Sequence, residues 1–282
     1  MQQFTLSAFA DEASPDFDLQ LAALKRCRIP LIEVRGVDGK GILSLTDAEL
    51  DAVCGKLAAA DIGVSAIGSP IGKISILDDF APHFEQFKRA VEIAKRLGTT
   101  RIRMFSFYMP QGENPENYFD AVVSRISRMV EYAEANGVHC CHENEKGIYG
   151  DTLARVQALH AAVPALRCVF DPANYIQCGD DPAENFKALA PIIDYMHIKD
   201  ALFADGSVVP AGEGDGSVPA ILKALVATNK PYILTLEPHL FDFSGLQALQ
   251  DDELLHKRVF RTSDEAFDTA ANALWTILDS LF

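Results

Sequence analysis

Short apolar segments alternate with longer segments of helical periodicity along the whole sequence, and this alternation limits the folds that the chain can adopt. Runs of about four to eight residues rich in β-branched and apolar side chains are typical of buried strands. These runs lie at residues 4–9, 31–35, 63–67, 100–105, 138–143, 167–171, 195–199 and 232–237. No linker rich in Pro, Gly or Ser divides them, which predicts one domain over residues 1–282.

The segments between the runs carry the signals of amphipathic helices. Ser14 and Pro15 predict an N-cap followed by proline at the first helical position. An apolar stripe within residues 84–94 ends before Gly98, the residue type that most often follows a helix. Near the end of the chain, the sequence Thr-Ser-Asp-Glu at residues 262–265 predicts a capping box and a final amphipathic helix.

Eight strand–helix units predict a single α/β domain with the architecture of a parallel (β/α)8 barrel, the TIM barrel. Such a barrel needs about 250 residues plus loops, which suits this chain better than an open doubly wound sheet does. The motifs GxGxxG after the first strand and GxxxxGKS/T are both absent from the sequence, so the usual nucleotide-binding signatures are missing.

Composition excludes several classes of protein. The net charge of −15 repels phosphate backbones and argues against nucleic-acid binding. No apolar run reaches the roughly 20 residues of a membrane-spanning helix, and the N-terminal residues do not resemble a presequence. The six cysteines form no CxxC pair, which predicts free thiols in a reducing compartment. We therefore expect a cytoplasmic protein.

The last four predicted strands each end in a potential metal ligand: Glu143, Asp171, His197 and Glu237. In a barrel of this type the carboxyl ends of the strands build the active site. The alternation of side chains places these four residues toward the barrel axis. Each one alone could be a buried polar group satisfied by hydrogen bonds, but three carboxylates at one point need a compensating cation. Oxygen donors with one imidazole suit Mn²⁺, Mg²⁺ or Co²⁺.

The residues around these four positions resemble those of a known family. The matching segments are Glu143-Asn144 with residues 148–152, then 170–174 (Phe-Asp-Pro-Ala-Asn), 197–200 (His-Ile-Lys-Asp) and 212–215 (Gly-Glu-Gly-Asp). From residue 4 to residue 282 the chain resembles the xylose isomerase-like barrel superfamily, in its sugar phosphate isomerase/epimerase family. The resemblance implies one divalent metal ion bound by Glu143, Asp171, His197 and Glu237, with Mn²⁺ expected first and Mg²⁺, Co²⁺ or Zn²⁺ as alternatives.

Departures from the family pattern narrow the activity. Strands three and four lack the additional histidines that the apurinic endonucleases of this superfamily use for a three-metal cluster. Residue 174 is Asn where those endonucleases and the ketose 3-epimerases tend to carry His. The sequence His-x-Lys-Asp at 197–200 is more similar to the inosose dehydratases.

Two reaction classes follow, with one shared intermediate. The first is a metal-dependent isomerase or epimerase of a small ketose or keto-polyol, in which Glu143 and Glu237 carry protons to and from a metal-stabilised enediolate. The second is a lyase or dehydratase acting on an inosose or oxidised sugar, in which a β-hydroxyl leaves from the same intermediate. A third hypothesis is a barrel that binds sugars or metals without catalysis. The acidic segment 212–216 opposes an anion, so a neutral substrate is favoured.

Other polar residues have two interpretations each. Lys199 points inward and would act as an acid or bind a substrate oxygen, or else pair with a glutamate. Arg103 and Glu33 also point inward and predict a structural ion pair, with contact to the substrate as the alternative for Arg103. Lys73 either reaches the pocket or is a solvated loop lysine.

Three further positions lie near the predicted barrel mouth. Asn174 would hydrogen-bond the substrate or cap the next helix, and His239 would line the mouth. His142 has the parity of the helix-facing side, which predicts a packed core histidine. The aromatic residues of loops 106–118 and 203–216 would form a rim or allow contact between copies of the chain in a homo-oligomer.

Overall fold

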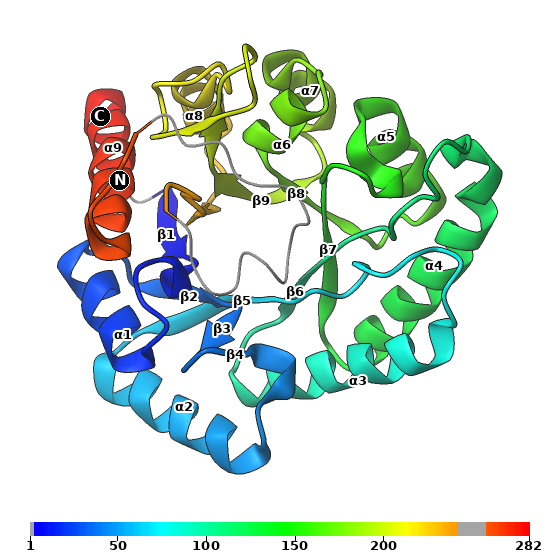
Figure 1. Ribbon diagram of the computed structural model, residues 1–282, viewed down its shortest axis with the longest axis horizontal. Coiled ribbons are helices and arrows are strands. Elements are labelled where there is room, and N and C mark those ends of the chain that lie inside the picture. Colours follow the sequence, from blue (N-terminus) through cyan, green and yellow to red (C-terminus); the bar gives the residue numbers. More distant parts are fainter. Residues whose placement is uncertain (1–2, 242–257) are drawn as a thin grey trace.

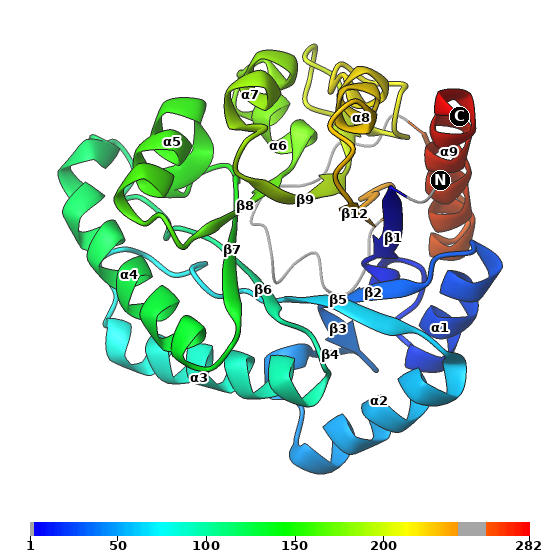
Figure 2. The same ribbon diagram turned by 180° about the vertical axis from the view of Figure 1, so that it is seen from behind.

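Eight parallel strands close into a barrel with helices around it, as the sequence predicts (Figures 1 and 2). The computed structural model describes residues 3–241 and 258–282. The strand order is β1-β12-β9-β8-β7-β6-β5-β2, and β1 pairs with β2 to close the ring. The barrel strands are β1 Phe4–Ala8, β2 Leu31–Val34, β5 Gly63–Gly68, β6 Arg101–Met104, β7 His139–Glu143, β8 Arg167–Phe170, β9 Ile193–Ile198 and β12 Tyr232–Leu236. Their ends lie within one or two residues of the predicted runs.

Helices follow the strands and form the outer layer (Figure 1). They are α1 Phe17–Arg26, α2 Asp47–Ala60, α3 Phe80–Arg96, α4 Phe119–Ala135, α5 Leu153–Ala162, α6 Pro172–Gln177, α7 Pro182–Leu189, α8 Val218–Val226 and α9 Ser263–Leu281. Two small antiparallel pairs stand apart from the barrel: β3 Gly36–Val37 with β4 Lys40–Gly41, and β10 Asp200–Ala201 with β11 Val208–Val209. Short 3-10 turns cover Ala10–Glu12, Ile42–Ser44, Pro115–Tyr118 and Tyr149–Asp151.

The first helix begins later than predicted. Ser14 is not its N-cap: Asp16 takes that position, and its carboxylate accepts a hydrogen bond from the Leu19 N–H at 3.0 Å. Ser14 Oγ instead accepts from the Asp16 N–H in the preceding turn. An ionised carboxylate at the positive end of the helix gains more than a hydroxyl does, so the later residue prevails.

The predicted capping box of the last helix is half formed. Thr262 Oγ1 accepts from the Glu265 N–H at 3.1 Å, as expected, but the Glu265 carboxylate accepts from Arg261 N–H at 3.0 Å rather than from Thr262. A complete box is found at the start of α2, between Thr46 and Glu49. The final helix nevertheless begins where the sequence indicated.

The apolar core lies between the barrel and the helices. Helix residues such as Phe17, Phe87 and Met129 are fully buried against the outward-facing strand residues. Inside the barrel, a small apolar layer at one level consists of Ala66, Cys141, Val169 and Tyr195. Toward the carboxyl ends of the strands the interior is polar and holds buried charged side chains. Buried ionisable groups therefore gather at the carboxyl ends of the strands, where the sequence predicted the active site.

His142 is a core residue, as its parity predicted. It faces the helix layer, where its Nε2 lies 2.9 Å from Ser106 Oγ and its ring lies 6.0 Å from the ring of His160. The Nδ1–H of His160 donates to the Leu166 carbonyl at 3.1 Å. Burial, together with the charge of His160, holds the pKa of His142 well below its usual value, and burial lowers the pKa of His160 to about 4.

The structure bears on three smaller expectations. All six cysteines lie in the described residues and are free thiols. None of the helices described is long and apolar enough to cross a membrane. Of the two rim loops, the first turns Phe107 into the core, so this aromatic residue is not a surface contact, whereas Phe203 in the second is 49% exposed.

Candidate metal centre

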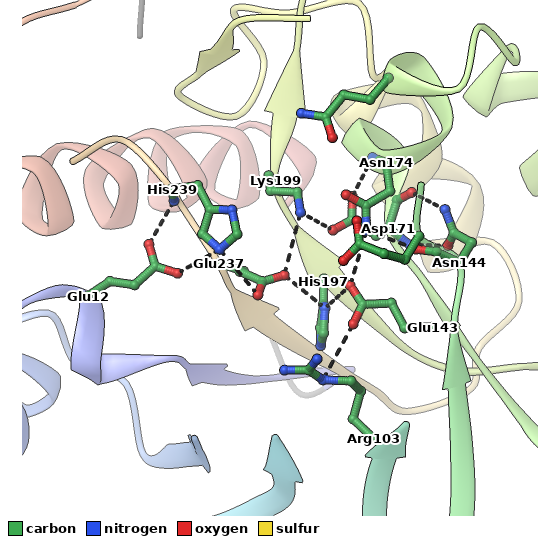
Figure 3. A network of polar contacts seen from close by, with 12 residues as sticks. Glu12, Arg103, Glu143, Asn144, Asp171, Asn174, His197, Lys199, Glu237 and His239 are labelled. Atoms are coloured by element: carbon green, nitrogen blue, oxygen red, sulfur yellow. Dashed lines mark hydrogen bonds and ion pairs between the residues drawn. The ribbon is translucent and has the colours of Figure 1, made fainter. Parts of the chain in front are cut away.

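Four side chains from neighbouring strand ends converge inside the mouth of the barrel (Figure 3). Glu143 is the last residue of β7, Asp171 follows β8, His197 lies in β9 and Glu237 follows β12. Each offers one ligand atom, and these atoms all lie within 4.8 Å of one another. All four residues are buried. The structure thus brings together the set that the strand-end argument selected.

Local structure explains why these side chains point inward. In β9, Met196 and Ile198 pack in the outer core, so the residue between them faces the axis. Asp171 is the N-cap of α6, and its Oδ1 accepts from the Asn174 N–H at 3.0 Å. This cap fixes the carboxylate and leaves Oδ2 directed toward the other three residues.

The four residues fit a divalent cation. Glu143 Oε2, Asp171 Oδ2 and Glu237 Oε2 are buried and accept no well-directed hydrogen bond from the part of the chain that the structure describes. Burying several carboxylates costs several kcal/mol unless positive charge compensates them. Among the lysine and arginine side chains described, the nearest to these oxygens are Lys199, at 2.9 Å from Asp171 Oδ2, and Arg103, at 3.4 Å from Glu143 Oε2. Three oxygen ligands with one imidazole nitrogen match the preferences of Mn²⁺, Mg²⁺ and Zn²⁺ at catalytic sites.

The carboxylates strongly change the ionisation of His197. Its Nδ1 lies 2.9 Å from Glu143 Oε1 and 3.1 Å from Glu237 Oε2, while its Nε2 lies 3.3 Å from Glu33 Oε2. Burial alone would lower the pKa of His197, but the three carboxylates outweigh burial and raise it well above the usual value. A proton on the imidazole therefore supplies positive charge at the position where a metal ion would otherwise supply it.

Lys199 lies on the opposite side of the same cluster. Its Nζ is 2.9 Å from Asp171 Oδ2 and 3.7 Å from Glu237 Oε2, so the predicted lysine–glutamate pairing is present but the aspartate is closer. Burial, helped by the charges of Glu143 and Glu237, raises the pKa of Asp171 to about 7 despite the lysine. Burial would also raise the pKa of Glu237, but Lys199 and His197 hold it well below its usual range.

Arg103 approaches the centre from β6. Its Nε lies 3.4 Å from Glu143 Oε2 and 4.0 Å from Glu33 Oε1, so the predicted pair with Glu33 is at the limit of an ion pair. Glu33 also accepts a hydrogen bond from the Tyr195 hydroxyl at 2.9 Å. The guanidinium stacks 4.6 Å from the ring centre of Phe105, and Arg103 Nη2 donates to no acceptor among the described residues.

Lys73 is not a solvated loop lysine. Its side chain is 6% exposed, its Nζ lies 3.0 Å from Glu145 Oε2, and it stacks 4.3 Å from the ring centre of Phe105. Lys73 therefore reaches the inner surface of the mouth, where it shares an aromatic ring with Arg103. Glu145 pairs with this lysine rather than with a candidate metal ligand.

Asn174 lies against the cluster and does not cap the helix. Its Nδ2 donates to the Asn144 carbonyl at 2.8 Å and to Glu143 Oε1 at 3.3 Å, while Asp171 occupies the capping position. Within residues 3–241 and 258–282, no donor reaches the buried Asn174 Oδ1. The amide both orients Glu143 and offers an acceptor to a ligand.

Sequence reasoning missed a second charged group on the other side of Glu237. Arg35, directly after β2, places Nη1 3.0 Å from Glu237 Oε1, Nη2 3.1 Å from Glu12 Oε1 and Nε 2.9 Å from Asp11 Oδ2. His239 Nε2 lies 3.4 Å from Oε1 of both Glu12 and Glu237. Burial raises the pKa of Glu12 to about 8 even beside Arg35. Applying the strand-end rule to the second predicted run would have found Arg35, its last residue, whereas Glu12 lies in the 3-10 turn after β1.

The comparisons with known proteins agree with the fold. The family model of the xylose isomerase-like TIM barrel matches residues 21–256. The chain belongs to this family. The uncharacterized protein YihM of Escherichia coli strain K12 is 24% identical over 242 residues, which cover 83% of this chain and 67% of that protein.

Solved structures of this xylose isomerase-like fold superpose over nearly the whole chain. A structure of L-ribulose 3-epimerase has a TM-score of 0.75 at 18% identity, covering 100% of this chain and 96% of its own. The IOLI protein with a zinc atom bound has a TM-score of 0.75 at 17% identity, covering 99% of each chain. The probable 3-DHS dehydratase AsbF of Bacillus anthracis has a TM-score of 0.72 at 18% identity, covering 97% and 98%. At these identities the likeness establishes the fold alone.

Proposed function

We propose that the chain is a divalent-metal-dependent isomerase or epimerase of a small, neutral ketose or keto-polyol. One observation carries the proposal: four buried ligand atoms from Glu143, Asp171, His197 and Glu237 lie within 4.8 Å of one another, with carboxylate oxygens that accept no well-directed hydrogen bond from the described residues. Membership of a family that includes enzymes, and fold neighbours described as an epimerase and a probable dehydratase, support an enzymatic role.

A divalent cation held by these four residues would act as a Lewis acid toward adjacent carbonyl and hydroxyl oxygens of the substrate. We propose Mn²⁺ as the resident ion, with Mg²⁺, Co²⁺ and Zn²⁺ as alternatives; fold neighbours hold a zinc atom and magnesium. The three carboxylates favour a hard cation, and the imidazole extends the choice to the transition metals.

Glu143 and Glu237 are the proposed proton carriers. The two carboxylates follow or end strands β7 and β12, on either side of β8 and β9, and both approach His197 Nδ1, at 2.9 Å and 3.1 Å. Each also lies beside its own guanidinium, Arg103 for Glu143 and Arg35 for Glu237, which holds its orientation. One glutamate would remove the proton from the carbon next to the carbonyl, and the other would return a proton to the opposite face of that carbon. The configuration of the carbon would thus be inverted.

Buried groups around the centre are suited to bind the substrate. Among the described residues, Arg103 Nη2 donates to no acceptor and Asn174 Oδ1 accepts from no donor. We assign them to a substrate oxygen and a substrate hydroxyl. Lys73, whose side chain is 6% exposed, and the buried His239 complete the proposed substrate contacts.

A dehydratase of an inosose or oxidised sugar is the second candidate, and Lys199 favours it. Its ammonium lies between Asp171 and Glu237, at 2.9 Å and 3.7 Å. A proton donor at this position can protonate a departing hydroxyl, so the same enediolate would lose water. Lys199 is thus the proposed general acid of this alternative.

Proton exchange tests the proposal and separates the two reactions. The metal-loaded protein is incubated in D₂O with ketoses, inososes and 3-keto-glycosides, and the products are followed by NMR and mass spectrometry. Deuterium next to the carbonyl, lost from one of the two epimers with Glu237→Gln, supports enolisation. A product of unchanged molecular formula, apart from deuterium, indicates the isomerase or epimerase, and a product that has lost water indicates the dehydratase. Failure of every panel member to exchange would contradict the proposed substrate class.

A further inference from the structure

Glu33 is a buried carboxylate that the proposed reaction does not use. It lies in β2, where Ile32 and Val34 on either side pack in the outer core, so its side chain points into the barrel. The register of β2 against β5 shifts between Ile32 and Glu33, an irregularity that commonly redirects a side chain near an active site. Glu33 is 1% exposed, so its charge needs partners inside the barrel.

Three side chains supply these partners. The Tyr195 hydroxyl donates to Glu33 Oε1 at 2.9 Å, and Arg103 Nε lies 4.0 Å from the same oxygen. The guanidinium is closer to Glu143, at 3.4 Å, so it is a weak partner for Glu33. The other oxygen, Oε2, lies 3.3 Å from His197 Nε2. One oxygen of Glu33 therefore contacts a candidate metal ligand.

The two ring nitrogens of His197 face different groups. Nδ1 lies 2.9 Å from Glu143 Oε1 and 3.1 Å from Glu237 Oε2, so it faces the other candidate ligands (Figure 3). Nε2 faces Glu33 instead. A neutral imidazole that binds a metal ion through one nitrogen carries its single proton on the other. If Nδ1 binds the cation, the proton is on Nε2 and needs an acceptor.

The surroundings of the imidazole make this acceptor important. His197 is fully buried, and the rings of Phe9 and Tyr195 pack against it edge to face, with ring centres 5.2 Å and 5.6 Å away. A buried N–H without an acceptor is costly. Glu33 Oε2 is the acceptor that the described residues bring within hydrogen-bond distance of Nε2.

We propose that Glu33 is a positioning residue of the metal centre: its carboxylate accepts the proton of His197 Nε2 and so fixes the tautomer in which Nδ1 binds the metal ion. An acceptor of this kind also makes the imidazole a stronger ligand. A purely structural role, as the partner of Arg103, would not determine which nitrogen of His197 binds the ion. The inference rests on the proposed function, because it requires the metal centre.

Three variants separate positioning from structure. Glu33→Met removes the acceptor and keeps a side chain of similar length. Glu33→Gln keeps an oxygen for the Nε2 proton, and its amide nitrogen can donate to the Tyr195 hydroxyl. Asp194→Asn is the matched control, because Asp194 lies in the same strand as His197 and pairs with Arg101 and Arg167. This control also removes the charge of a carboxylate paired with arginine.

The affinity for Mn²⁺ is measured by calorimetry with protein stripped of metal by a chelator. We expect Glu33→Met to lower the affinity by about 10- to 100-fold, as the loss of an outer partner of a metal ligand does. Glu33→Gln should lower it by only about two- to tenfold, because a neutral acceptor remains, and Asp194→Asn should leave it unchanged. Affinity retained in Glu33→Met, equal losses in Glu33→Met and Glu33→Gln, or an equal loss in Asp194→Asn would overturn the inference.

NMR of the wild type gives a reading that does not depend on the folding of any Glu33 variant. In ¹⁵N-labelled protein loaded with Zn²⁺, the ring signals of His197 are those that His197→Gln lacks. We expect a proton on Nε2 that exchanges slowly with solvent, and none on Nδ1. A proton on Nδ1, or none on Nε2, would overturn the inference while leaving the metal centre intact. Absence of any bound ion in the wild type contradicts the metal centre of the proposed function and overturns this inference with it.

Discussion

Arg35 Nη1 lies 3.0 Å from Oε1 of Glu237, an ion pair between residues 202 positions apart in the chain. This contact turns the other carboxylate oxygen toward His197 and Lys199, at 3.1 Å and 3.7 Å. Both partners of the pair are almost fully buried, so water does not weaken it. The orientation of one candidate metal ligand therefore depends on a residue that follows β2, which is separated from β12 in the barrel by β1 alone.

A shorter side chain at residue 35 should weaken metal binding without removing a metal ligand. We expect Arg35→Lys to lower Mn²⁺ affinity and kcat/KM by about 10- to 100-fold, as the loss of outer partners of metal ligands does. Arg26→Lys is the control, because Arg26 forms its ion pairs with Asp264 and Asp268 on the surface. Metal titration and kinetics measure the effect, and an unchanged affinity for Arg35→Lys would contradict the assigned role.

The two glutamates should have complementary effects on proton exchange. If Glu143 and Glu237 act on opposite faces of one carbon, Glu143→Gln and Glu237→Gln each block abstraction from one epimer by about 10²- to 10⁴-fold. Each variant lacks one candidate metal ligand, so the assay is run at Mn²⁺ concentrations that saturate it; under these conditions each should still exchange the proton of the other epimer in D₂O. Surface variant Glu92→Gln is the control. If one variant blocks both epimers and the other blocks neither, a single base operates.

Lys199 should be more important for stability without metal than with it. Its ammonium compensates Asp171 and Glu237, so we expect Lys199→Met to destabilise the metal-free protein by about 3–5 kcal/mol, the usual cost of breaking a buried pair. A cation bound by the same carboxylates replaces that charge. Mn²⁺ should therefore raise the Tm of Lys199→Met more than the Tm of the wild type. Equal shifts in a thermal melt would show that the lysine and the metal ion do not share these carboxylates.

His160 should contribute to acid sensitivity. Burial lowers its pKa from 6.5 to about 4, so below pH 6.5 the unfolded chain binds a proton that the folded chain does not. Stability is therefore expected to fall as pH decreases from about 6.5 to 4, by on the order of 2–3 kcal/mol from this residue. His160→Asn keeps a donor for the Leu166 carbonyl and does not titrate. Denaturant melts across this range should show a flatter profile for the variant, and parallel profiles would contradict this origin.

The barrel and the four convergent residues could be predicted because both depend on local periodicity. Alternation along β9 predicts that Met196 and Ile198 face the helices and that His197 faces the barrel axis. The position of polar residues at the carboxyl ends of the strands then indicates the candidate metal ligands. The partners of these residues could not be predicted in the same way. The contact of Arg35 with Glu237 joins distant segments, and the preference of Lys199 for Asp171 depends on rotamers that the order of residues does not specify.

Smaller differences have equally physical causes. The helix after β1 starts at Asp16 rather than Ser14 because two capping residues compete within one turn. Lys73 is buried because its charge pairs with Glu145 from another loop.

Metal binding decides whether the four convergent residues form a metal centre. Protein stripped with a chelator is titrated with Mn²⁺ by calorimetry, and the bound ion is counted by native mass spectrometry. We predict one bound ion per chain for the wild type. The control variant His142→Gln, which changes a residue that faces the helix layer, should bind one ion as well, whereas Asp171→Asn and His197→Gln should lose metal affinity. Absence of a bound ion in the wild type, or binding that survives both ligand variants, would contradict the metal centre.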